Sequence, residues 1–372
     1  AGGGYVEYLS ASVTASMNDA TRSFSLELSD RDRGLYPGTP VKIFGDSGQL
    51  LIDGYVNGYT ASFDATSHRI SVSGRGKGQD AIDCSCDHST GQFKNKTAVE
   101  ICNEICAASG IESKYLDNIG LPKIAQFHIN QGETVHQVAR RLSRNYAATI
   151  MGAADGVMVW TTAENASHGG LLKEGVFPLL SASVNLDDSR EFSDFKFRSQ
   201  LAGREEKYGA EASQSQAVVG GEHRRTRPHI EIVDKSQDQA QSKERADWQA
   251  RRIQAGSKAI SAEIVGDSVG APVEPNMKIF VDSAWLGVNQ EMLIESCTWT
   301  TDSNGTRTGL KLVPPEAFKG KSSSASTKGA MTADGGMRSP VTGATPKSKP
   351  TTPSISPSEP AYGTLARTGN AE

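Results

Sequence analysis

The first part of the chain alternates between apolar and polar positions, which is the pattern of strands buried on one face. In LSASVTASM (9–17), the apolar residues alternate with serines and a threonine, so one face is apolar and the other carries hydroxyl groups. Strand patterns with tight turns between them recur at 24–28, 41–44, 50–63 and 69–75. Several short strands with no helix between them predict an antiparallel barrel or sandwich.

The period changes to that of helices after this region. Thr97 and Glu100 form a capping-box pattern, and the following apolar stripe ends before Gly110. Thr134 and Gln137 open a second amphipathic helix in the same way. Strand-like pieces follow at 148–153 and 156–162. Together these elements predict a small α/β unit.

A second β region follows the α/β unit. Strands are expected at 229–234, 259–265, 277–282, 291–301 and 308–313, and Asn304-Gly305 is a strong hairpin signal between the last two. The polar residues 201–228 predict a long exposed loop. Residues 237–256 have the spacing of a helix that ends at Gly256.

The two β regions resemble each other in sequence. PGTPVKIF (37–44) is echoed by EPNMKIF (274–280), and LLID (50–53) by MLIES (292–296). Polar turns at Asp64 and Asp302 then lead to closing strands in both copies. The ordered series predicts two related barrels with the α/β unit inserted between them. Three such chains around a threefold axis would form a ring of six similar barrels.

The fold class expected is therefore mainly β with an α+β insert. The first antiparallel barrel is expected at 1–88, the α/β insert at 89–182, and the second barrel at 183–318, with an inserted loop and helix at 201–256. Residues 319–372 are rich in Ser, Thr and Pro and cannot bury enough apolar surface to offset the entropy of ordering, so a disordered or extended tail is expected.

Composition narrows the function. The 372 residues carry a net charge of -4, so no global basic field points to a surface-bound nucleic acid. No apolar run approaches the roughly 20 residues needed to cross a bilayer, and the N-terminus lacks a secretion signal, which indicates folding in a cytoplasm. The motifs HExxH, GxSxG and GxxxxGK[ST] are absent. We expect no enzymatic activity and assign no catalytic, cofactor-binding, metal-binding or interface residue.

The five cysteines leave a metal site as an open alternative. Cys84, Cys86 and His88 are residue types that zinc accepts, but their spacing is not that of a standard knuckle. Cys102 and Cys106 flank an apolar helix stripe, where a free cysteine behaves as a small hydrophobic residue. An odd count without a secretion signal argues against a disulfide framework.

A basic cluster and three tryptophans are candidates for contact with nucleic acid. Residues 224–227, RRTR, could attract phosphates in a DNA passage, but nearby glutamates favour an exposed loop. Trp248, Trp285 and Trp299 are expected to anchor a core or an interface rather than stack on bases.

The ordered set of segments resembles the baseplate hub proteins of contractile-tailed bacteriophages, of the Mu-like P type. The likeness covers roughly residues 5–318, and its segments include SVTASMNDATRSFSLELSDR (12–31), ISVSGRGKGQDAIDCS (70–85), RADWQARRIQAGSKAI (245–260) and LGVNQEMLIESCTW (286–299). The resemblance implies a homotrimeric hub of paired barrels in the virion baseplate, assembled in the bacterial host cytoplasm. It implies contacts with the tail tube, the central spike and other baseplate proteins, with DNA only in transit through the channel.

The stretch INQGETVHQVARRL (129–142) supports an alternative function. A Gly-acid-Thr turn opening a short helix also occurs in LysM repeats, so residues 129–147 could bind peptidoglycan or serve a wall-degrading tail component. Any capping box before an amphipathic helix produces the same string, however, and no repeat array is present.

Overall fold

The computed structural model describes residues 8–28, 34–116, 123–145, 148–163, 168–187, 189, 191–199, 215–220, 225–233, 247–248, 250–253 and 258–318. The strands of the first β region are β1 (Tyr8–Ser16), β2 (Ser23–Leu28), β3 (Pro40–Phe44), β4 (Leu50–Phe63) and β5 (His68–Gly76). The second region contains β11 (His168–Lys173), β12 (Leu179–Leu186), β16 (Lys258–Val265), β17 (Lys278–Ser283), β18 (Val288–Asp302) and β19 (Gly305–Val313).

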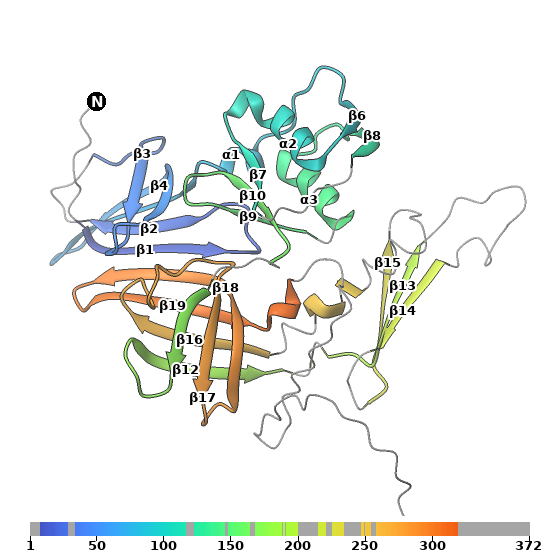
Figure 1. The fold of residues 1–372 in the computed structure, drawn as a ribbon. Coiled ribbons are helices and arrows are strands. Elements are labelled where there is room, and N and C mark those ends of the chain that lie inside the picture. The colour runs from blue at the N-terminus through green and yellow to red at the C-terminus, as the bar shows by residue number, and fades with distance from the viewer. Residues whose placement is uncertain are drawn as a thin grey trace, which may run out of the picture.

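These eleven strands form one continuous sheet rather than two separate ones (Figure 1). The strand order is β12-β16-β19-β18-β1-β2-β5-β4-β3, and β17 pairs with both β18 and β11. The first β region is joined to the second because β1 lies between β2 and β18. Within the described residues no strand pair closes either half into a barrel, so the expected pair of barrels stays a prediction.

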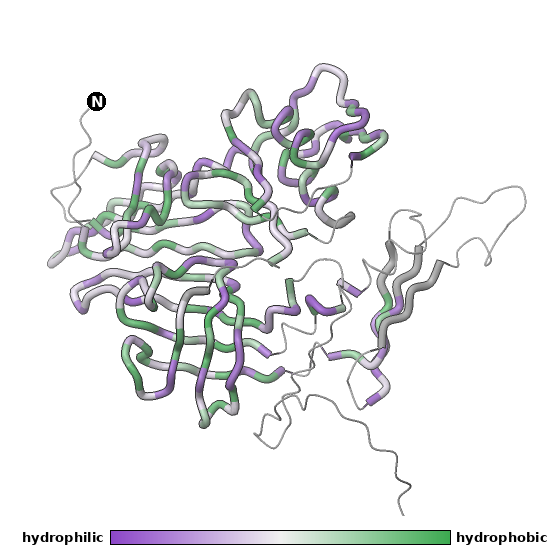
Figure 2. Tube along the Cα trace, in the orientation of Figure 1, coloured by the Kyte–Doolittle hydropathy of each residue, from purple (hydrophilic) through white to green (hydrophobic). Residues whose placement is uncertain are grey.

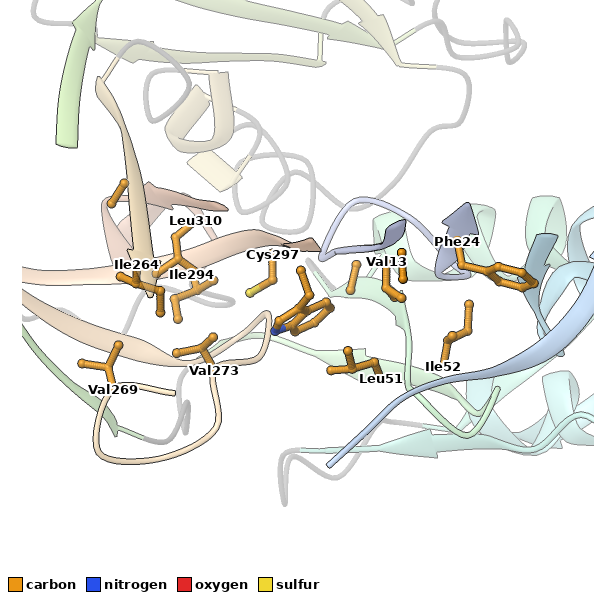
Figure 3. Close-up of a cluster of buried hydrophobic side chains, with 14 of the residues drawn as sticks. Val13, Phe24, Leu51, Ile52, Ile264, Val269, Val273, Ile294, Cys297 and Leu310 are labelled. Carbon is orange, nitrogen blue, oxygen red and sulfur yellow. The ribbon is translucent and has the colours of Figure 1, made fainter. Parts of the chain in front are cut away.

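A single apolar core lies under both halves of the sheet. Along β1 the side chains of Ala11, Val13 and Ala15 are buried, as their alternation with hydroxyl residues predicts. Figure 2 shows hydrophilic and hydrophobic residues interspersed along the long strands of the sheet. Side chains from the two regions meet in one cluster, shown in Figure 3, that includes Val13, Phe24, Leu51, Ile52, Ile264, Val269, Val273, Ile294, Cys297 and Leu310.

The α/β insert has its own core. Its elements are α1 (Gln79–Asp83), β6 (Gln92–Lys96), α2 (Ala98–Cys106), β7 (Ser113–Tyr115), β8 (Ile124–His128), α3 (Val135–Asn145), β9 (Thr149–Gly152) and β10 (Met158–Thr161). Thr97 and Glu100 form the predicted capping box of α2, and Gly110 takes the left-handed conformation just beyond it. Thr134 and Gln137 exchange the same two hydrogen bonds at the start of α3.

The strand pairing favours an insert that ends earlier than residue 182. β11 pairs with β17 and β12 pairs with β16, so both strands belong to the large sheet. The domain boundaries given from sequence remain proposals for this reason.

Part of the expected loop and helix at 201–256 is strand, so that expectation was wrong for residues 215–220. Strands β14 (Ser215–Gly220) and β15 (Pro228–Val233) flank β13 (Asp194–Ser199) in a separate three-stranded sheet. The adjacent β-branched residues Val218 and Val219 carry enough strand propensity to pair with the Phe-rich β13. Helical residues are present at 247–248 and 250–253. The expected tail at 319–372 lies outside the described residues.

Candidate functional site

The two halves of the large sheet repeat one strand order. The first half is β1-β2-β5-β4-β3, and the second is β12-β16-β19-β18-β17. In the first half, β3, β4 and β5 form an antiparallel meander, and β2 and then β1 pair beyond β5. In the second half, β17, β18 and β19 form the same meander, and β16 and then β12 pair beyond β19. The internal similarity seen in the sequence therefore corresponds to a repeated topology.

The register of the repeat is fixed by matching irregularities in β4 and β18. The β4–β5 ladder shifts after Val56, and the β18–β19 ladder shifts after Ile294. In both halves a residue with positive φ precedes the meander and donates its backbone N–H to the strand at this point. That residue is Gly38 (φ 89°) in the first half and Asn276 (φ 69°) in the second. From this point on, equivalent residues of the two halves are separated by the same number of positions as Val56 and Ile294.

This register corrects the alignment made from sequence. Pro40 pairs with Tyr55 and Lys278 pairs with Leu293, so Lys278 is equivalent to Pro40 and not to Lys42. The shared letters KIF are two residues out of register, and LLID corresponds to residues 288–291 rather than to MLIES. A two-residue slip leaves every side chain on the same face, which is why the apolar pattern did not reveal it.

The clearest sequence signal of the repeat was missed. The pentapeptide LSASV occurs at 9–13 in β1 and again at 180–184 in β12. The two copies are structurally equivalent, because Val13 pairs with Phe24 of β2 and Val184 pairs with Ile260 of β16. Each copy also has a register shift at its leucine, Leu9 or Leu180.

One of these two strands forms the junction between the halves. Residues 11–16 of β1 pair antiparallel with residues 296–301 of β18, and we call this pairing the lateral seam. Val13 lies opposite Trp299 and Ala15 lies opposite Cys297, all four on the buried face. On the other face the hydroxyl oxygens of Thr14 and Thr298 are 3.4 Å apart.

The equivalents of the seam strands have open edges. In the described residues β12 pairs only with β16, and β3 covers β4 only up to Tyr55. The remaining part of β4, residues 58–63, pairs with β5 alone. Large apolar side chains are exposed along these edges: Phe63 is 82% exposed, Leu186 64% and Leu180 50%.

The face of the sheet opposite the core is rich in hydroxyl groups. A row of paired residues crosses four strands through Ser73, Ser25, Ser12 and Thr300. A second row passes through Ser23, Thr14 and Thr298, and a third through Ser296, Lys311, Ser261 and Ser183. Two of the basic side chains on this face have acidic partners, Arg307 with Glu263 at 3.7 Å and Lys311 with Glu295 at 2.9 Å.

A buried arginine connects the insert to both halves. The Arg22 guanidinium is 5% exposed and forms an ion pair with Glu274 at 2.5 Å. It also donates to the carbonyl oxygens of Leu51 and Gly152, at 2.8 and 3.3 Å. A Cβ on Gly152 would lie 2.7 Å from the Ala20 carbonyl oxygen, so only glycine allows β9 to approach the β1–β2 turn this closely.

The candidate metal residues have separate environments. His88 Nε2 lies 3.2 Å from Glu104 Oε1, and its ring packs on Phe93. Burial raises the pKa of Cys86 to about 11 and that of Cys106 to about 11, and it raises the pKa of Cys102 further. Among the described residues, no group of three His, Cys, Asp or Glu side chains is placed to hold a metal ion.

The Gly-Glu-Thr turn makes its polar contacts within the insert. The Glu133 carboxylate accepts hydrogen bonds from the Asn130 backbone N–H at 2.8 Å and from Arg141 at 2.7 Å. Arg141 also donates to the His128 carbonyl and lies 4.4 Å from the centroid of the Phe127 ring. These contacts fix the entry to α3.

The remaining sequence candidates are dispersed. Trp248 and Trp299 are buried, as expected of anchors, whereas Trp285 is 87% exposed at the β17–β18 turn. Of the basic cluster, Arg225 and Arg227 lie before β15, and Arg224 is outside the described residues. No described helix is long and apolar enough to cross a membrane.

Comparison with known proteins gives these surfaces a context. Residues 78–162 match the second domain of baseplate hub protein gp44-like, and residues 238–321 match the fourth domain of the Mu phage baseplate assembly protein GpP. The chain is 27% identical over 333 residues to the baseplate hub protein gp44 of Escherichia phage Mu, covering 84% of this chain and 86% of the relative.

Solved structures agree with the sequence relatives. The 43 kDa tail protein of prophage MuSo2 from Shewanella oneidensis has a TM-score of 0.72 and 26% identity, covering 85% of this chain and 96% of its own. A tail protein from Neisseria meningitidis MC58 shares the fold, with a TM-score of 0.71 at 17% identity over 84% of this chain and 95% of its own. Two domain families, a sequence relative and a solved structure thus all support a Mu-like baseplate hub protein.

Proposed function

We propose that this hub protein is a non-enzymatic structural component that forms a homotrimer, a pseudo-sixfold ring between the tail tube and the central spike. The ring would surround the DNA channel in the virion baseplate and contact other baseplate proteins, after assembly in the host cytoplasm. The observation that carries the proposal is the repeated strand order, which gives each chain two similar units side by side in one sheet. Three such chains supply six units around a threefold axis.

The two faces of the sheet suit the two sides of such a ring. The main apolar core lies on one face of the sheet. On the opposite face, a smaller apolar cluster that includes Leu293, Val313 and Phe318 covers one end of the second half, and the rows of serine and threonine cross the strands beyond it. A lining of serine and threonine with paired charges would contact water and passing DNA without the strong phosphate attraction of a basic surface. The polar face is therefore the proposed channel wall.

The mass of the assembly in solution tests the proposal. Light scattering on the purified full chain should give three times the mass of the chain, and electron micrographs of end views should show six lobes around a central hole. A stable dimer or tetramer, or a chain that remains a monomer at high micromolar concentration, would contradict the trimeric ring. The assay requires no ligand and no knowledge of the host.

A further inference from the structure

Within the described residues, two strand edges of each chain have no strand partner, and both belong to strands whose counterparts are paired in the lateral seam. β12 is equivalent to β1, and residues 58–63 of β4 are equivalent to residues 296–301 of β18. The lateral seam therefore forms once within the chain. The two strands that could form a second seam, β12 and residues 58–63 of β4, lie at opposite ends of the sheet. They lie on different units of the same chain, at opposite ends of the strand order β12-β16-β19-β18-β1-β2-β5-β4.

Burial differs between the two copies of the same strand. Ala11 and Val13 are 8% and 2% exposed in β1, where β18 covers them. Their equivalents Ala182 and Val184 in the identical pentapeptide are only partly buried. Open edges with exposed apolar side chains favour the addition of another strand, and the repeat itself shows which strand fits.

We propose that β12 of one chain pairs antiparallel with residues 58–63 of β4 in a second copy of the chain, in the register of the lateral seam. This inference rests on the proposed ring and specifies its contact. In the seam Ser12 lies opposite Thr300, and the equivalent residues are Ser183 and Ser62. The seam pairs Ala11 with Thr301 and Ala15 with Cys297 have as their equivalents Ala182 opposite Phe63 and Leu186 opposite Tyr59.

This register accounts for the exposed apolar residues on both edges. Ala182, Val184 and Leu186 lie on the face of β12 that corresponds to the buried face of β1. Their predicted partners Phe63, Ala61 and Tyr59 correspond to Thr301, Trp299 and Cys297. The pairing would continue the apolar core from one chain into the next and bring Leu180 close to Phe63. Because the two edges differ, the contact is head-to-tail, which allows a ring to close.

Cysteine cross-linking tests the register directly. The pair Ser183→Cys and Ser62→Cys is introduced into a chain that also carries Cys84→Ser and Cys86→Ser, which removes the two least buried thiols. Directly opposed residues of antiparallel strands have Cα atoms about 4.5–5.5 Å apart, within disulfide range. Mild oxidation should link more than half of the chains into covalent dimers and trimers on a denaturing gel.

Three controls determine what the cross-link means. The pair Ser12→Cys and Thr300→Cys should close within one chain, independent of concentration. The pair Ser183→Cys and Thr60→Cys, two residues out of register, should link at least fivefold less, because diagonal neighbours are about 7–8 Å apart. Chains with Ser183→Cys alone should not link to each other, whereas a mixture with Ser62→Cys chains should give dimers only.

The outcomes separate this pairing from the ring itself. A trimer by light scattering that fails to cross-link through Ser183→Cys and Ser62→Cys overturns the pairing and leaves the ring standing. Links between Ser183→Cys chains alone overturn the head-to-tail contact in favour of a twofold one, and preferential links to Thr60→Cys overturn the register. A chain that stays monomeric overturns the ring and the pairing together.

Discussion

β1 and β12 share the pentapeptide LSASV and occupy equivalent places in the two halves of the sheet, but their surroundings differ. β1 lies between two strands and its apolar face is buried, while β12 has one strand partner, β16, in the part of the chain that the structure describes. Identical residues are thus buried in the core in one position and only partly covered in the other. Under the proposed pairing, a repeated strand keeps its sequence while one copy serves folding and the other serves association.

The strongest test of this difference is the same substitution in both strands. Val13→Asp should destabilise the fold by at least about 4 kcal/mol, because it places a carboxylate in the shared core. Val184→Asp should change the stability of the isolated chain by less than about 1 kcal/mol, since its side chain is only partly covered. It should instead reduce association by at least tenfold.

Denaturant titration and light scattering measure the two effects separately. Equal destabilisation by both substitutions would show that β12 is as buried as β1 in the isolated chain. Normal association of the Val184→Asp chain would show that β12 is not part of the interface.

The second test concerns Arg22, whose side chain contacts both halves of the sheet and the insert. Arg22→Met should lower the free energy of unfolding by about 3 kcal/mol, because Glu274 and the Leu51 carbonyl lose their buried partner. Lys258 lies at the equivalent position of the second half and is half buried, so Lys258→Met should cost less than about 1 kcal/mol. Similar losses from both substitutions, measured by chemical denaturation, would contradict an unequal role.

The insert lies outside the proposed contact between β12 and β4, so the helix caps of the insert should affect stability without affecting association. Thr97→Ala removes the N-cap of α2 and should cost about 1 kcal/mol. The mass of the assembly should not change. A shift toward monomers in light scattering at unchanged temperature would place α2 in the interface instead.

Thiol labelling gives the smallest but most local comparison. Cys297 is fully buried on the seam, and burial raises the pKa of its thiol well above the usual range, so it should stay unreactive in every state at pH 8. Leu186→Cys should label within minutes in dilute chains and at least tenfold more slowly in the assembly. Equal labelling of Leu186→Cys in both states would leave the β12 edge exposed to solvent.

Sequence reasoning identified the elements better than their connections. The capped helices at Thr97 and Thr134 and the hairpin at Asn304-Gly305 were predicted because their signals are local. The joining of β1 to β18 was not, because pairing between strands some 280 residues apart has no local pattern. The short match KIF drew the alignment two residues away from the structural register, while the exact repeat LSASV was overlooked. Strand β14 was missed because its few residues with strand propensity lie within a long polar segment, 201–228, that is typical of a loop.

The candidate surfaces could be derived only once the pairing was known. Sequence marks Phe63 and Leu186 simply as apolar residues in strands, and alternation would place them in a core. Their exposure follows from the absence of a neighbouring described strand, which the topology gives and composition does not. The metal and sugar-binding hypotheses arose from residue types alone, and His88 and Glu133 make contacts within the insert.

The most direct measurement is a reconstruction of the assembled protein by electron cryomicroscopy at a resolution that separates strands. The account predicts that the Cα of Ser183 lies about 4.5–5.5 Å from the Cα of Ser62 in the next chain, the range expected for Ser12 and Thr300 within one chain. It also predicts that the sheet continues unbroken from chain to chain. An assembly in which β12 faces solvent, or pairs with another β12, would contradict it.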